Sequence, residues 1–129
     1  MAQTTVKLQK GITVGEVQNR NAVLRELTAG DVIAAAEESE RLIMVPNGNE
    51  IEPRLVLSNA LMGINTLRRQ IAQLGEIQGP LEIEQLSLLS ETDLELLQNA
   101  AESMDSAVAK AVTDRGRADA ASGDDQASD

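Results

Sequence analysis

Residues 22–31 read AVLRELTAGD, and the pattern of the chain changes within this stretch. Its first part, AVLREL, follows the connection Asn19-Arg20-Asn21 and has the apolar content of a short strand. Thr28 then suits a helix N-cap, and Asp31 stands three residues later, where an acidic side chain completes a capping box. The sequence therefore predicts strands before residue 28 and helices after it.

The segment that precedes this stretch is typical of antiparallel strands. Polar and apolar residues alternate over 5–8 and again over 12–14. Gly11 interrupts the alternation and Gly15 follows it, and glycine readily adopts the positive φ of a tight turn. We expect a small antiparallel β-hairpin, or a three-stranded meander that includes residues 22–27.

A helix is expected to begin after Thr28 and to extend to about residue 44. Its apolar residues share one face at helical spacing, and they are Val32, Ile33, Ala36, Ile43 and Met44. Glu40 falls inside that apolar arc, and Arg68 lies at the edge of the apolar face of a later helix. These two side chains could pair between helices, or each could reach solvent along its own apolar stem.

Residues 46–49, PNGN, are a turn signal. Residues 42–45 and 51–57 could pair across this turn as a second hairpin, or Pro53 could open the next helix at its first turn. We expect extended structure through residue 57, with Ser58 as the N-cap of the helix that follows.

Three further helices are expected. The clearest covers residues 60–74, where apolar residues recur every three or four positions and Gly75 suits the C-terminal end. Residues 83–89 favour a short helix over a strand. Residues 90–93, SETD, repeat the capping pattern and open a long helix to about Val112, with an inner face of Leu94, Leu97, Ala101, Met104, Val108 and Ala111. The predicted fold class is α+β: a small N-terminal antiparallel β-hairpin or meander, followed by a three- to four-helix bundle.

The last 17 residues differ from the rest, because 113–129 contain no Leu, Ile, Val or Met. Such a segment cannot bury enough apolar area to offset the entropy lost on ordering. We therefore predict a small α+β domain over 1–112 and a disordered acidic tail over 113–129. Asp124 and Asp125 in this tail lack the surrounding pattern of a calcium-binding loop.

The composition removes most catalytic chemistry. The 129 residues include no Cys, His, Trp, Tyr or Phe, so the chain has neither a thiolate nor an imidazole for nucleophilic catalysis or transition-metal binding. Carboxylates are abundant, but we expect them on solvated helix faces, where nothing raises a pKa for acid catalysis; they are Glu37, Glu38, Glu82, Glu84, Glu91, Asp93 and Glu95. The chain is therefore not expected to be an enzyme, and no catalytic, cofactor-binding or metal-binding residue is predicted.

The net charge of −10, from 11 basic and 21 acidic residues, disfavours polyanionic partners. Nucleic acids and anionic membranes attract basic patches, which this chain lacks. Residues 82–89 and 91–112 have the outline of a helix-turn-helix, but its second helix would direct Glu91, Asp93 and Glu95 toward phosphates. Since there is neither a signal peptide nor an apolar run of roughly 20 residues, we expect a cytoplasmic chain whose partners are proteins.

Several stretches are similar to the Mu-like tail assembly chaperones of contractile-tailed phages and prophages. They are TVKLQKGITVG at 5–15, AVLRELTAGD at 22–31, LRRQI at 67–71, IQGPL at 77–81, and the spacing Leu89-Ser90, Asp93, Leu97, Ala101. The resemblance covers roughly residues 4–112 and includes no catalytic motif.

The resemblance implies a non-enzymatic protein of the host cytoplasm that binds the tape measure protein and helps to scaffold polymerisation of the tail tube. The tail tube protein is a candidate second partner, self-association is a further option, and the chaperone would be absent from the mature virion. Many such genes also yield a longer product by ribosomal frameshifting. The residues that contact partners are not predicted. A small acidic regulatory or antitoxin-like protein-binding module is the alternative function.

Overall fold

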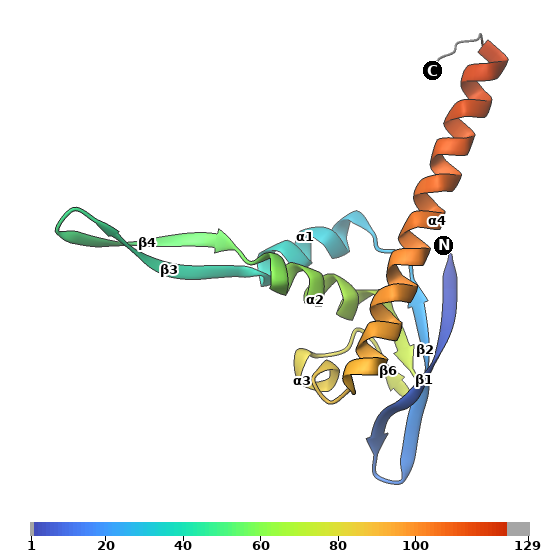
Figure 1. Cartoon of the computed structure of the whole chain (residues 1–129), viewed down its shortest axis with the longest axis horizontal. Coiled ribbons are helices and arrows are strands. Elements are labelled where there is room, and N and C mark those ends of the chain that lie inside the picture. The colour runs from blue at the N-terminus through green and yellow to red at the C-terminus, as the bar shows by residue number, and fades with distance from the viewer. Residues whose placement is uncertain (1, 124–129) are drawn as a thin grey trace.

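The computed structural model describes residues 2–123. Ten elements follow one another along the chain (Figure 1), namely β1 (Gln3–Val14), β2 (Val17–Arg25), α1 (Ala29–Glu38), β3 (Glu40–Asn47), β4 (Glu50–Leu57), α2 (Asn59–Gln70), β5 (Ile71–Leu74), β6 (Ile77–Gln78), α3 (Ile83–Leu86) and α4 (Glu91–Gly123). The fold is mixed α+β with antiparallel sheets, as the sequence predicts.

The main sheet has four strands in the order β1-β2-β5-β6. The expected N-terminal hairpin is confirmed: β1 and β2 pair antiparallel around a turn at Gly15, which has a φ of +62°. On its other edge β2 pairs with β5, so that Ala22 lies opposite Leu74. The sheet therefore joins the N-terminal hairpin to a short hairpin from the middle of the chain.

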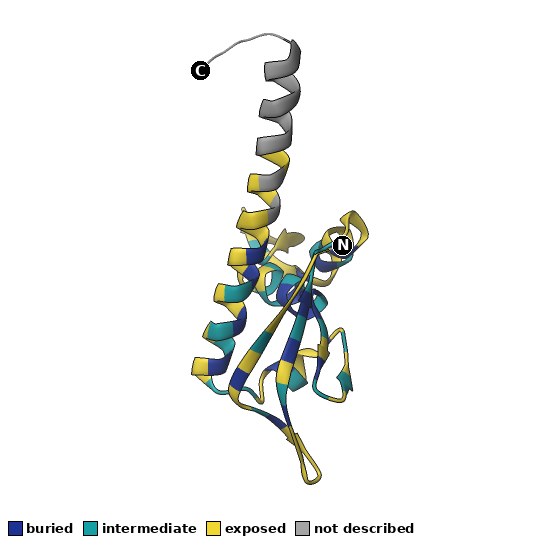
Figure 2. Cartoon of the chain, turned by 90° about the vertical axis from the view of Figure 1, so that its right-hand side faces the viewer, coloured by how far each residue is buried: buried dark blue, intermediate teal, exposed yellow. Residues whose placement is uncertain are grey.

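The hydrophobic core lies between one face of this sheet and the helices that cover it. From the strands it takes Leu8, Ala22, Leu24 and Leu74, and α4 contributes Leu97, Ala101 and Met104. Figures 1 and 2 show α4 running beside the sheet, with its first turns against β1. Each leucine buried in this way contributes about 1.5–3 kcal/mol of transfer free energy.

The predicted helix bundle is not confirmed. The long helix α4 packs on the sheet, while α1 and α2 pack on each other. The physical reason is that the strand face with Leu8 and Leu24 needs a cover, and the apolar stripe of α4 supplies it.

The prediction of a helix from Thr28 to about residue 44 is wrong in its second half. α1 ends at Glu38, and Ile43 and Met44 belong to β3, which pairs with β4. The second hairpin that the turn signal at 46–49 allows is therefore the correct alternative. Ser58 is the N-cap of α2, as expected, since its side chain accepts a hydrogen bond from the Leu61 amide.

The helix expected over residues 60–74 is also too long. α2 stops at Gln70, and Ile71–Leu74 form β5 instead. The short apolar run at 71–74 is compatible with either a helix or a strand, and its pairing with β2 makes it a strand. Gly75 does adopt a positive φ, +59°, but in the turn that leads to β6.

The capping signal before α4 is confirmed, because the Asp93 amide donates to the Ser90 hydroxyl at 3.2 Å. The predicted disorder from residue 113 is not confirmed, since α4 continues to Gly123. Arg and Ala in 113–123 are strong helix formers, and a helix that is already nucleated extends at low cost. The side chains of Val108 and Ala111 and the pair Asp124-Asp125 lie outside what the structure describes.

A candidate protein-interaction surface

β3, β4 and the turn between them form a two-stranded ribbon that projects from the body of the molecule (Figure 1). We call this ribbon, residues 40–57, the arm. Its register is regular from the pair Glu40 and Leu57 at the base to the pair Asn47 and Glu50 at the tip. A turn with a φ of +65° at Gly48 closes it. The ribbon is not part of the main sheet.

The register places most of the apolar residues of the two strands on one side of the arm. Side chains directly opposite in an antiparallel pair share a face, and faces alternate along each strand. One face therefore carries Glu40, opposite Leu57 at the base of the arm, and a set of exposed apolar residues, namely Leu42, Met44, Pro46, Ile51, Pro53, Leu55 and Leu57. We call this set the apolar face. Its leucines at positions 42 and 55, which lie opposite each other, are 64% and 67% exposed.

The opposite face of the arm is mixed. It carries Arg41, Ile43, Val45, Asn47, Glu50, Glu52, Arg54 and Val56. Three Glu and two Arg give the whole arm a net charge of −1, so the remaining residues carry −9 of the total of −10. The arm is therefore nearly neutral on a strongly acidic molecule. An exposed apolar strip of this kind is characteristic of a surface that binds another protein.

A buried polar cluster fixes the base of the arm. Ser39 is completely buried where α1 meets β3. Its hydroxyl donates to the Ala35 carbonyl at 2.6 Å and accepts from the side-chain amide of Asn65 at 2.9 Å. The amide of Ser58 donates to the Ser39 carbonyl. Because both ends of the arm meet at this cluster, the arm leaves the body in a defined direction.

Ion pairs hold α1 against β2 and α2. Arg25 donates two hydrogen bonds to Asp31, at 2.8 and 3.1 Å. Glu38, at the other end of α1, accepts from Arg68 at 2.9 Å and from Arg69 at 2.7 Å. The pair of Glu40 with Arg68 is therefore not formed: Arg68 is buried and pairs with Glu38, whereas Glu40 lies exposed at the base of the arm.

The charged side chains of these ion pairs stabilise one another. The guanidinium of Arg25 and the Thr28 amide hold the pKa of the Asp31 carboxyl well below its usual range. Arg69 lowers the pKa of Glu38 in the same way. These groups are charged at neutral pH, and the network they form keeps the orientation of the helix from which the arm starts.

Asp93 corrects the prediction that the helix carboxylates all lie on a solvated surface. It is completely buried, and its oxygens accept from the backbone amides of Gln9, Lys10 and Gly11 at 2.7, 3.0 and 2.9 Å. Burial alone would raise the pKa of Asp93, but the three amides and the Ser90 hydroxyl outweigh it and lower the pKa. Asp93 therefore connects the start of α4 to the irregular part of β1.

The other predicted carboxylates remain on the surface. Glu37, Glu38, Glu82, Glu84, Glu91 and Glu95 are all exposed. Within residues 2–123 no group of three acidic side chains could hold a metal ion. None of the described helices is long and apolar enough to cross a membrane.

The sequence alone does not indicate which residues contact partners, whereas the structure places an exposed apolar strip on the arm. Leu97, Ala101 and Met104 of α4 are buried against the sheet. A signal for the arm exists in the sequence. Apolar residues occupy every second position on both sides of the turn at 46–49, so that a hairpin there brings them to one face.

These features define a mixed α+β domain with an exposed apolar arm. The family of tail assembly protein gp41 matches residues 8–117, and the chain belongs to this family. It is 42% identical to the Mu-like prophage FluMu protein gp41 of Haemophilus influenzae over 88% of this chain and 87% of the relative. It is 43% identical to the probable tail assembly protein gp41 of Escherichia phage Mu, over 87% of this chain and 78% of the relative.

A longer relative is also similar. The probable tail assembly protein FS-gp41 of Escherichia phage Mu is 43% identical over 84% of this chain, which corresponds to 57% of that protein. No solved structure matches the chain. The resemblance to a phage tail assembly family is thus confirmed, and the phage Mu relatives are named for assembly and not for a catalysed reaction.

Proposed function

We propose that this protein is a non-enzymatic tail assembly chaperone that binds the tape measure protein in the host cytoplasm. It would keep that long helical partner in solution, help to scaffold polymerisation of the tail tube, and leave before the virion is complete. The tail tube protein is the second partner in this proposal. The observation that carries it is the apolar face of the arm.

The apolar face suits a long amphipathic partner. Its seven residues are uncharged, the charge on that side of the arm is confined to Glu40 at the base, and the arm as a whole is close to neutral. An apolar helix could therefore lie along the arm beyond Glu40 without burying an unpaired charge. Partly covering a leucine contributes on the order of 1 kcal/mol, so each copy would bind weakly. Many copies side by side on one elongated partner would gain from effective concentration, and each would still be displaceable.

The regulatory or antitoxin-like alternative receives no support from the comparisons. The phage Mu relatives are named as probable tail assembly proteins, and this chain covers most of the first of them. The assembly function is therefore the one we propose.

Co-expression with the tape measure protein of the same phage tests the proposal. The tape measure protein should be insoluble alone, soluble when co-expressed with the full chain, and should co-elute with it on size exclusion. Leu42→Ser/Leu55→Ser, which interrupts the apolar face, should abolish the rescue. A suitable control is Val14→Ser/Leu88→Ser, because these two side chains are also exposed but lie outside the arm.

The control variant should rescue the partner as well as the unmodified chain does. If the tape measure protein is equally soluble with and without this chain, the chaperone function is wrong. If both double variants lose the rescue equally, the arm is not the binding surface.

A further inference from the structure

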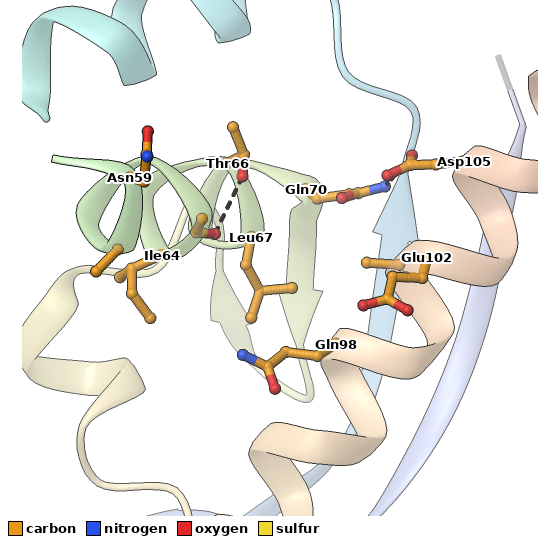
Figure 3. Close-up of a pocket in the computed structure, with 11 residues that line it drawn as sticks. Asn59, Ile64, Thr66, Leu67, Gln70, Gln98, Glu102 and Asp105 are labelled. Atoms are coloured by element: carbon orange, nitrogen blue, oxygen red, sulfur yellow. Dashed lines mark hydrogen bonds between the residues drawn. The ribbon is translucent and has the colours of Figure 1, made fainter. Parts of the chain in front are cut away.

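A cleft lies between α2 and α4 (Figure 3). Its volume is about 410 Å³, which is within the range of ligand and side-chain binding pockets. Ile64 and Leu67 of α2 and Ala101 of α4 give it an apolar floor, and polar side chains from both helices surround this floor. We call it the α2–α4 cleft.

Gly63 lines this cleft from within α2, and the described part of the chain gives no reason for a glycine there. A Cβ at position 63 would meet no atom within 4 Å, and the backbone is not in the left-handed region. Alanine would fit, and it would favour the helix by roughly 0.5–1 kcal/mol. The open space over Gly63 would, however, let the backbone of another molecule approach α2 closely.

The polar rim of the cleft includes two carboxylates beside amide and hydroxyl side chains. Glu102 and Asp105 of α4 are exposed, and neither pairs with a basic side chain that the structure describes. Gln70 is only 2% exposed and donates its amide nitrogen to Asp105 at 3.2 Å. If the side-chain amide of Gln70 were reversed, its oxygen would face the carboxylate oxygen of Asp105. The orientation with the nitrogen toward Asp105 is therefore the favourable one.

This orientation leaves the Gln70 carbonyl oxygen without a hydrogen-bond donor from any residue that the structure describes. A buried acceptor without a donor costs about 1–3 kcal/mol. The Gln70 carbonyl oxygen therefore has room for a donor from outside the chain, and the two carboxylates beside it favour a donor that is positively charged.

We propose that the α2–α4 cleft binds a helical segment of a partner protein that presents an apolar side chain flanked by Lys or Arg. The apolar side chain contacts Ile64 and Leu67, and the basic side chain lies between Glu102 and Asp105. A helix is the occupant because two helices form the walls, and Gly63 permits close packing of a third. This site is independent of the tape measure proposal, which concerns the arm.

The test measures binding of a short amphipathic Leu/Lys helical peptide to the full chain by fluorescence anisotropy, with a Leu/Glu peptide of the same pattern for comparison. The Leu/Lys peptide should bind and the Leu/Glu peptide should not. Gly63→Leu fills the cleft and should weaken binding at least about tenfold, while its melting temperature stays the same or rises.

Two charge variants form a matched pair. Glu102→Gln/Asp105→Asn removes both carboxylates of the cleft, and Glu91→Gln/Glu95→Gln removes two exposed carboxylates elsewhere on the same helix. The first should weaken binding by about tenfold and the second by less than about twofold, if local pairing and not net charge attracts the peptide. Equal losses in both variants would overturn the proposal.

Two further results would also overturn it. One is unchanged binding to Gly63→Leu. The other is loss of peptide binding in the arm variant Leu42→Ser/Leu55→Ser, because the peptide would then bind the apolar face and not the cleft.

Discussion

Leu24 in β2 and Leu55 in β4 are both leucines in regular antiparallel strands, but Leu24 is completely buried whereas Leu55 is 67% exposed. The difference does not lie in the strands themselves, because in both of them successive side chains point to opposite faces. It lies in what covers them. Leu24 belongs to a sheet whose apolar face is packed into a common core with residues of α4, and the apolar face of the arm has no helix against it.

The comparison separates two uses of the same residue types. In the body, apolar side chains stabilise the fold, and the buried carboxylate of Asp93 accepts hydrogen bonds from three backbone amides. In the arm, apolar side chains contribute little to the fold of a single chain and remain available to a partner. An isolated two-stranded ribbon is marginal in water, which is consistent with an arm that gains stability on binding.

The largest effect is expected in the body. Leu24→Ala should lower the free energy of unfolding by about 2–5 kcal/mol, because the substitution leaves a cavity in the core. Urea denaturation monitored by circular dichroism measures this. A loss below about 1 kcal/mol would mean that the core around β2 is loosely packed, and it would weaken the contrast with the arm.

Asp93→Asn should have the next largest effect, about 1.5–3 kcal/mol, because one of its oxygens is replaced by an amide group that cannot accept the β1 hydrogen bonds. Glu95→Gln is the control, since Glu95 is exposed on the same turn of helix. Thermal unfolding of both variants gives the comparison. If the two variants have the same melting temperature, Asp93 does not connect α4 to β1 as strongly as its contacts indicate.

Acid should destabilise the body as carboxylates with lowered pKa values are protonated. For Asp31 and Asp93, the pKa in the folded chain lies below the unfolded value of about 3.9. Their contribution is therefore fully present above about pH 5 and is lost as the pH falls below 4. Each group adds at most about 1.4 kcal/mol per pH unit. Unfolding free energies at pH 7 and 5 should agree, and Asp93→Asn should show a shallower decline below pH 4. A decline that begins above pH 6 would contradict this assignment.

Sequence patterns predict the local features of this fold well. The capping pairs at Thr28 and Ser90 and the turns at Gly15 and Gly48 are all present. Each of these depends on neighbours a few residues away, and such neighbours are visible in the sequence. The N-terminal hairpin follows from the same kind of local information.

The errors concern long-range contacts. Residues 71–74 have helical spacing, and only their pairing with β2, about 50 residues earlier in the chain, makes them a strand. Asp93 looks like an ordinary surface carboxylate because its partners are more than 80 residues away. The apolar face of the arm could be found only if the second hairpin was preferred to the longer helix, since helical spacing places the same residues on a different surface.

The smallest effect on stability is expected for Leu55→Ala, which makes the same chemical change as Leu24→Ala but on the exposed face of the arm. The free energy of unfolding should change by less than about 0.5 kcal/mol, because the side chain is already mostly in water. The same variant should nevertheless weaken rescue of the tape measure protein, so stability and binding separate at this residue. Unfolding should be measured at several protein concentrations. If Leu55→Ala destabilises the chain as much as Leu24→Ala does at every concentration, the arm is covered within its own chain and cannot serve as a free binding surface. If the loss grows with concentration, a second copy covers the apolar face, and self-association takes the place of the tape measure protein there.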